Sequence, residues 1–454
     1  MKDIAGIPFD WARFDKDGQP QNDPKIPAGT TDLIIVSHGW KNTEPDATAL
    51  YTQLFTNFAE VTKADPDYAA RKLAIIGVLW PAKQFDLAMT NIAASGSKAG
   101  GVLSAGPQAA AADSEKAMQE AIDRAATFFD EPGEAEEIAK LRTLTERLEK
   151  NEKSAKEEFV AALRRMLDPD GQAAGMKSDD DASRKFFGGN AERIFDQAKQ
   201  PVPASTQDST APVAPQDPNA PVGSASGQEA GFFGDLVSGA ANGVANLLNL
   251  TTYFKMKIRA GTVGSKGVAP LIDRLVAQVQ RVHLVGHSFG GRLVTAAAAD
   301  STTTKIHSLS LLQAAFSHNG FSRSREGFFR KVVDGKRVKG PILITHTKND
   351  RAVGLAYPAA SRISRDTALG FGDADDEFGG IGSNGAQQMD KDEIFAGTKT
   401  LVDVKGAYDF KAGKLHNLES SKFIVDPKDA KRDAHGFIHV PQVAWAISRA
   451  LVSA

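Results

Sequence analysis

Five short runs of apolar, mostly branched residues constrain the fold of this chain more than any other feature. The runs are Leu33–Ser37, Leu73–Trp80, Val282–Val285, Leu309–Leu312 and Ile342–Thr345. Such runs are typical of strands that are buried on both faces, as in a parallel sheet. Helical patterns follow several of them, at Ala49–Val61, Gly291–Ala299 and Pro441–Leu451. The alternation predicts an α/β fold with a mostly parallel central sheet flanked by helices.

One long insertion interrupts this alternation, because no buried strand is predicted from about Lys83 to Gly267. Ser114–Leu167 is rich in Ala, Glu, Lys, Arg and Leu with interleaved charges, which predicts two or three amphipathic helices. Residues 199–228 are dominated by Pro, Ser, Thr, Asp and Gln and are predicted to be a disordered linker.

These patterns divide the chain into three parts. We expect a first part of the core at 1–82, a helical cap or insertion at 83–266, and a second part of the core at 267–454. An independent helical domain without a role at the site remains an alternative for the insertion.

Composition and charge narrow the classes of function. Of the 454 residues, 41% are hydrophobic and 24% are charged, as in ordinary soluble globular proteins. The net charge of −2 argues against a nucleic-acid partner, which usually meets a basic face. The chain has no cysteine, which excludes disulfides, thiolate metal sites and cysteine nucleophiles.

The N-terminal segment has no apolar stretch of signal-peptide length, so a cytoplasmic location is expected, with leaderless secretion as an alternative. No apolar run reaches the ~20 residues that a membrane helix needs. The nearest, Gly231–Leu250, contains Asp235 and four glycines, and we interpret it as a lid or a buried helix. The segment 231–254 is the expected place of contact with a lipid surface.

The stretch RVHLVGHSFGGRLVTAAAA, Arg281–Ala299, places one serine at a sharp turn from strand to helix. Gly286-His287-Ser288-Phe289-Gly290 matches G-x-S-x-G, in which small flanking residues let the strand and the helix pack closely around an exposed serine. The helix that follows directs its positive N-terminal dipole at any negative charge that forms nearby. Ser288 is therefore the candidate nucleophile.

A serine nucleophile needs a base and a group that orients the base, and in this topology the acid precedes the histidine along the chain. We choose His435, which lies in a glycine-containing loop before the last helix, whereas we expect His439 to pack. Asp350 follows a predicted strand and is the preferred acid. We expect the three competing aspartates to be surface charges; these residues are Asp426, Asp429 and Asp433.

Backbone donors for a tetrahedral oxyanion are predicted at two loops. One donor is the N–H of Phe289, directly after the nucleophile, and the other is the N–H of Trp40. His38, Gly39 and His287 are expected to support these loops. No cofactor and no metal is predicted, because H-E-x-x-H, a phosphate-binding loop and a strand-linked G-x-G-x-x-G are absent from the sequence.

The segments LIIVSHGW, LVGHSFGGR, THTKNDRAVGLAYPAASR and DAHGFIHVPQVAWAI resemble the α/β-hydrolase family, in a bacterial branch of serine esterases and lipases. The resemblance covers Thr31–Trp80 and Gly267–Ala454. It implies an α/β-hydrolase fold and a Ser288, His435 and Asp350 triad that hydrolyses carboxylic esters through an acyl-enzyme. The long segment between Trp80 and Val282 departs from the common pattern, which leaves the substrate open.

We therefore expect an esterase-like or lipase-like serine hydrolase with a small-molecule or lipid ester as its substrate. Two alternatives remain at this point. One is a non-catalytic binding or scaffold protein on the same fold, favoured by the charged helices and the linker, and the other is a lipase-type toxin effector.

Overall fold

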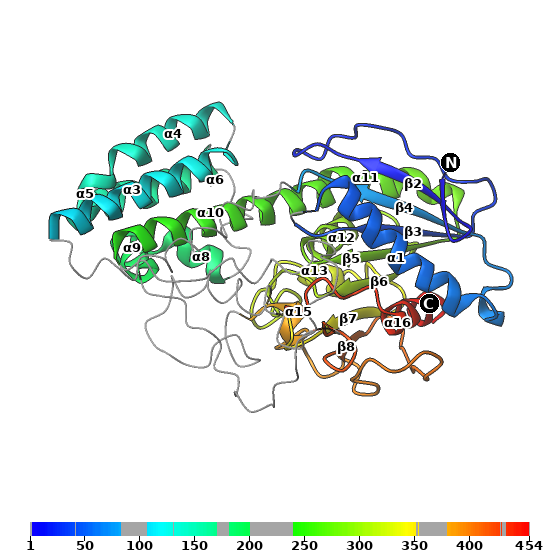
Figure 1. The fold of residues 1–454 in the computed structure, drawn as a ribbon. Coiled ribbons are helices and arrows are strands. Elements are labelled where there is room, and N and C mark those ends of the chain that lie inside the picture. The colour runs from blue at the N-terminus through cyan, green and yellow to red at the C-terminus, as the bar shows by residue number, and fades with distance from the viewer. Residues whose placement is uncertain are drawn as a thin grey trace.

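The strands of this protein form one sheet in the order β1-β2-β4-β3-β5-β6-β7-β8. Figure 1 labels this series from β2 to β8. The computed structural model describes residues 2–40, 42–82, 107–129, 131–169, 181–199, 239–350, 353, 379–426, 428 and 433–453. Only β1 runs antiparallel to its neighbour among these strands. The bounds are β1 (Lys2–Ile4), β2 (Ile7–Arg13), β3 (Asp32–Ser37), β4 (Leu73–Leu79), β5 (Arg281–His287), β6 (Ile306–Leu312), β7 (Ile342–His346) and β8 (Leu415–Glu419).

Helices cover both faces of the sheet, which explains why the central strands are continuous apolar runs. Leu33 and Ile35 of β3 belong to one buried cluster, together with residues of α10 (Ala240–Thr262), α11 (Ala269–Leu275) and α12 (Phe289–Asp300). The alternate residues Ile34 and Val36 belong to a second cluster, with residues of α1 (Glu44–Thr62) and α16 (Pro441–Val452). This division follows from the two-residue period of a strand.

A helical body lies to one side of the sheet in Figure 1 and contains most of the described part of the insertion. Its helices are α3 (Pro107–Ala126), α4 (Pro132–Thr143), α5 (Thr145–Glu149), α6 (Lys153–Leu167), α8 (Asp181–Gly188) and α9 (Ala191–Ala198). The long helix α10 runs from this body back to the sheet and continues through the π-helix η4 (Val263–Val268) into α11. The insertion is therefore connected to the core by an almost continuous helical rod. Two short helices complete the core, α13 (Arg330–Asp334) and α15 (Ile381–Asn384).

The five apolar runs and the three helical patterns of the core are confirmed as β3 to β7 and as α1, α12 and α16. The amphipathic pattern over Ser114–Leu167 is likewise helical, in α3 to α6. The strands β1, β2 and β8 were not predicted, because they lie at or near the sheet edges and contain exposed or half-exposed positions. Of the predicted disordered linker 199–228, all but Lys199 lies outside the described residues.

A buried carboxylate ties together several segments at the start of the parallel strands. Asp32 of β3 accepts hydrogen bonds from Arg71 Nη1 at 2.5 Å and from Arg281 Nε at 2.6 Å. His283 Nε2 lies 3.2 Å from the same carboxylate. Burial raises the pKa of Asp32, but the hydrogen bonds from His283, Arg281 and Thr31 outweigh it and hold the pKa far below its usual range. The network lies near the N-terminal end of β5, whereas Ser288 follows its C-terminal end. The candidate site therefore lies at the C-terminal ends of the parallel strands.

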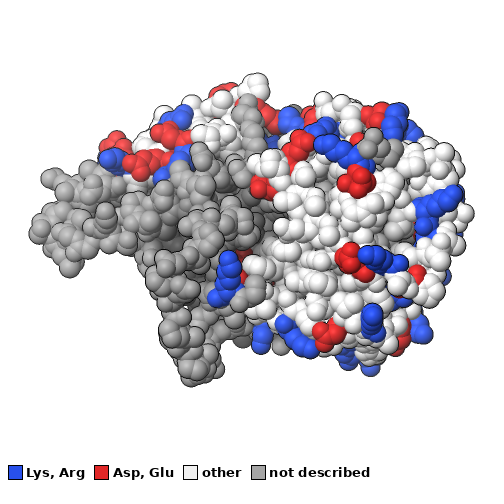
Figure 2. Space-filling view, turned by 45° about the vertical axis from the view of Figure 1, so that its right-hand side comes forward, with Lys and Arg blue, Asp and Glu red and all other residues white. Residues whose placement is uncertain are grey.

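Two surface properties bear on partners. No helix of the described ranges has both the length and the apolar character that crossing a lipid bilayer would need. On the face shown in Figure 2, acidic and basic side chains are interspersed among uncharged ones.

Candidate active site

Ser288 lies at the junction between β5 and α12, where the backbone takes an unusual conformation. Its φ is 56° and its ψ is −126°, a region that residues other than glycine rarely adopt. Such strain persists only where the surrounding structure enforces it, and it often occurs at functional sites. Gly290 allows the first turn of α12 to lie close to the end of β3, since a Cβ there would lie 2.2 Å from the carbonyl oxygen of Ser37. The turn brings Ser288, 6% exposed, to the N-terminus of α12.

The structure brings the predicted base and the predicted acid together. The Nδ1 of His435 lies 2.8 Å from Oδ2 of Asp350, and both side chains are almost completely buried. Asp350 follows β7, and its other oxygen, Oδ1, accepts a hydrogen bond of 2.8 Å from the N–H of Val353. A carboxylate in this position holds the proton of the imidazole on Nδ1 and leaves Nε2 as the basic nitrogen.

His287 connects the loop of His435 to the strand that precedes Ser288. Its Nε2 lies 2.9 Å from the carbonyl oxygen of His435, and the two rings are 4.7 Å apart. Burial is the main reason why the pKa of His287 lies well below its usual value, and the neighbouring His435 lowers it further. His287 precedes Ser288 directly, so this contact brings the loop of the base to the same end of β5 as the serine.

The loop after β3 lies directly against Ser288. A Cβ added to Gly39 would lie 2.6 Å from the Cβ and 3.1 Å from the Oγ of Ser288. His38 stacks on Trp80 at 5.7 Å, and the indole N–H of Trp80 donates to the His38 carbonyl at 3.2 Å. Burial lowers the pKa of His38 to about 4. A neutral, fixed His38 therefore supports the loop that contains Gly39 and Trp40.

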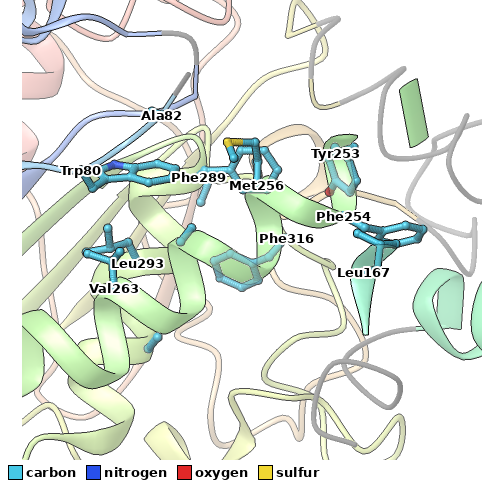
Figure 3. Close-up of a cluster of buried hydrophobic side chains, with 14 of the residues drawn as sticks. Trp80, Ala82, Leu167, Tyr253, Phe254, Met256, Val263, Phe289, Leu293 and Phe316 are labelled. Carbon is cyan, nitrogen blue, oxygen red and sulfur yellow. The ribbon is translucent and has the colours of Figure 1, made fainter. Parts of the chain in front are cut away.

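Aromatic rings from three parts of the chain meet at Phe289, the residue after Ser288. The ring of Phe289 lies 6.0 Å from Trp40 and 5.2 Å from Tyr253. Figure 3 shows Tyr253, Met256 and Phe289 within one buried hydrophobic cluster. Since Tyr253 belongs to α10, the insertion contributes a ring that packs on Phe289, the residue after Ser288. Of the segment 231–254, residues 231–238 lie outside the described residues, and the remainder consists of Gly239 and the first part of α10.

The competing acids are placed differently from the sequence-based expectation. Asp426 and Asp433 are both 4% exposed, so the prediction that they are surface charges was wrong, whereas Asp429 lies outside the described residues. Oδ1 of Asp433 accepts from the backbone N–H of His435 at 3.2 Å, and Oδ1 of Asp426 accepts from the N–H of Lys428 at 2.9 Å. Two residues of separation allow an Asx turn, in which the carboxylate accepts a hydrogen bond from the backbone. His439 is half-buried, and its ring lies 6.2 Å from that of Phe437.

One buried residue beside this site was not predicted from the sequence. Gln313 follows β6, is fully buried and has a φ of 42°. Neither atom of its side-chain amide has a hydrogen-bond partner among the described residues. The preceding residue, Leu312, accepts a hydrogen bond of 3.1 Å from the N–H of Ser288. A single glutamine at a strand end has no motif around it, so nothing in the sequence distinguishes it.

Within the described ranges, no group of three or more histidine, aspartate or glutamate side chains is arranged to hold a metal ion. Comparisons with protein-family models, with curated proteins and with solved structures found no match to this chain.

Proposed function

We propose that this chain has an α/β-hydrolase fold and is a serine hydrolase that cleaves carboxylic esters through an acyl-enzyme. The observation that supports this most strongly is the buried Asp350–His435 pair, in which the carbonyl of His435 is also bound by His287, the residue before Ser288. A strained serine at the start of a helix, a buried imidazole and a buried carboxylate are the three groups that such chemistry needs.

In the first step, Oγ of Ser288 attacks the ester carbonyl carbon while Nε2 of His435 takes the hydroxyl proton. The C=O π electrons move to the carbonyl oxygen and form a tetrahedral oxyanion. The N–H groups of Trp40 and Phe289 are the proposed donors to this oxygen. Asp350 stabilises the imidazolium and does not take a proton itself.

In the second step, the intermediate collapses, the bond to the alcohol oxygen breaks, and His435 returns its proton to the leaving alcohol. A water molecule then attacks the acyl-serine, with His435 again accepting the proton. Release of the carboxylic acid restores Ser288 with its hydroxyl proton.

The aromatic cluster supports an apolar acyl group as the part of the substrate beside Ser288. Trp40 is partly buried and packs its ring on Phe289, while Phe289, Tyr253 and Met256 are buried in the same cluster. Apolar side chains with a few polar groups are typical of small-molecule sites. The preference for esters over peptides rests on analogy with the fold.

A fluorophosphonate probe tests the proposal because it reacts with activated serines. We expect wild-type protein to be labelled at Ser288, and Ser288→Ala and His435→Ala to lose the label while their circular dichroism stays unchanged. Ser154→Ala, an exposed serine of the insertion, is the matched control and should be labelled like the wild type. A folded wild-type protein that takes no label and hydrolyses no p-nitrophenyl ester would contradict the proposal and favour a binding protein.

A further inference from the structure

The contact between His287 and the backbone of His435 has a consequence for the catalytic base. A carbonyl oxygen only accepts hydrogen bonds, so the contact of 2.9 Å requires a proton on Nε2 of His287. In the neutral ring Nδ1 then carries no proton, and this atom is buried without a hydrogen-bond partner among the described residues.

A protonated His287 would be costly in this place. Its Nδ1–H would be buried without an acceptor, and its positive charge would lie against the ring of His435 at 4.7 Å. Burial and the charge of the neighbouring His435 lower the pKa of His287 and outweigh the raising effect of its bond to the His435 carbonyl. The residue is therefore a neutral donor with one defined tautomer.

We propose that His287 is a positioning residue that holds His435 in place for catalysis, by donating its Nε2–H to the His435 carbonyl and packing against the imidazole ring. The role rests on the proposed function, since it acts through the catalytic base. His287 is a buried residue at the end of β5, whereas His435 lies in a loop outside the regular elements. The hydrogen bond therefore fixes the backbone of His435 to the end of a strand of the sheet.

Three contacts then define the position of His435 from different directions. Asp350 binds Nδ1 of the ring, Asp433 accepts from the backbone N–H, and His287 donates to the backbone carbonyl. A rotation of this peptide would move Nε2 relative to Oγ of Ser288. A misplacement of about 1 Å costs on the order of 10²-fold in rate.

Two variants distinguish the effect of the His287 hydrogen-bond donor from the effect of its ring packing. His287→Gln keeps an N–H the same number of bonds from the backbone, whereas His287→Phe keeps a planar ring and removes the donor. We expect His287→Phe to lose about 10²-fold in kcat with little change in KM, and His287→Gln to recover most of that loss. If His287→Phe does not fold, His287→Met removes the donor from a side chain of similar length. His416→Phe, a substitution on β8, is the control and should keep the wild-type kcat.

A proton NMR measurement tests the inference without activity. The Nδ1–H of His435, bonded to Asp350, should give a downfield resonance in the wild type and in His287→Gln, and a broadened or shifted one in His287→Phe. If the chain hydrolyses no ester, the proposed function fails, while this resonance still tests the position of His435. Equal kcat and equal resonance in His287→Phe and the wild type would overturn the inference, and so would equal losses in His287→Phe and His287→Gln.

Discussion

The Nδ1 of His435 lies 2.8 Å from Oδ2 of Asp350, although 85 positions separate the two residues in the chain. Both side chains are buried, and each has further hydrogen bonds within its own loop. A buried carboxylate with a histidine partner and a backbone donor is satisfied, so the pair is a stable part of the fold as well as the centre of the candidate site.

Replacing the carboxylate by an amide tests this pair. Asp350→Asn keeps the shape of the side chain but favours the wrong tautomer of His435, and we expect kcat to fall by up to about 10⁴-fold. Steady-state hydrolysis of p-nitrophenyl esters measures the loss. Asp426→Asn, at another buried aspartate, should retain a rate close to that of the wild type. A near-normal rate in Asp350→Asn would show that another acid orients the base.

The contact between Gly39 and Ser288 predicts an effect of a single methyl group. In Gly39→Ala the new Cβ would lie 2.6 Å from the Cβ of Ser288, so the nucleophile or the loop must move. We expect a loss of about 10²-fold in kcat, the scale of a displacement of about 1 Å, with the fold retained. Gly133→Ala is the matched control, because a Cβ there meets open space. Unchanged hydrolysis by Gly39→Ala would argue against a rigid loop at the nucleophile.

Tyr253 tests whether the insertion takes part in substrate binding. Tyr253→Ala removes the ring that packs on Phe289 at 5.2 Å and shortens the apolar surface beside Ser288. We expect kcat/KM to fall more for long-chain than for short-chain p-nitrophenyl esters, while Tyr253→Phe, which keeps the ring, stays close to the wild type. Each methylene of the acyl chain that loses its apolar contact corresponds to about 1–3 kcal/mol, or roughly 10- to 200-fold for the long-chain ester. A uniform loss at every chain length would assign Tyr253 to the fold alone.

Buried neutral histidines predict how stability changes with pH. Burial lowers the pKa of His38 and of His283 to about 4, and that of His287 well below its usual value. Below about pH 6.5 the unfolded chain binds protons that the folded state excludes, so the free energy of unfolding decreases as the pH falls from about 7 to about 4. Each such group contributes a slope of up to about 1.4 kcal/mol per pH unit.

Urea unfolding at several pH values measures this slope. His38→Gln removes one of the buried imidazoles and should flatten the curve by the contribution of one proton. His38 lies beside the site, so the readout is stability and not activity. A free energy of unfolding that rises as the pH is lowered through this range would contradict the assignment of these rings as neutral.

The sequence alone determined the central strands, the helices after them and the turn at Ser288. These features have local causes, since apolar runs need burial on both faces and a strand that turns sharply into a helix needs small residues around the turn. The same local rules predicted helices in the insertion. They missed the edge strands β1 and β8, whose alternating or exposed residues carry a weaker pattern.

Only the tertiary structure decided which distant groups meet. Several aspartates stand before the last helix or after a strand, and their sequence positions do not state that Asp350 reaches the imidazole while Asp433 bonds the backbone of the same residue. The bond from His287 to the His435 carbonyl, the contact of Gly39 with Ser288 and the packing of Tyr253 on Phe289 likewise depend on how strand ends and loops converge. Periodicity reports the environment of a residue along its own strand or helix, whereas the partner of a buried polar group is set by the packing of segments that are far apart in the chain.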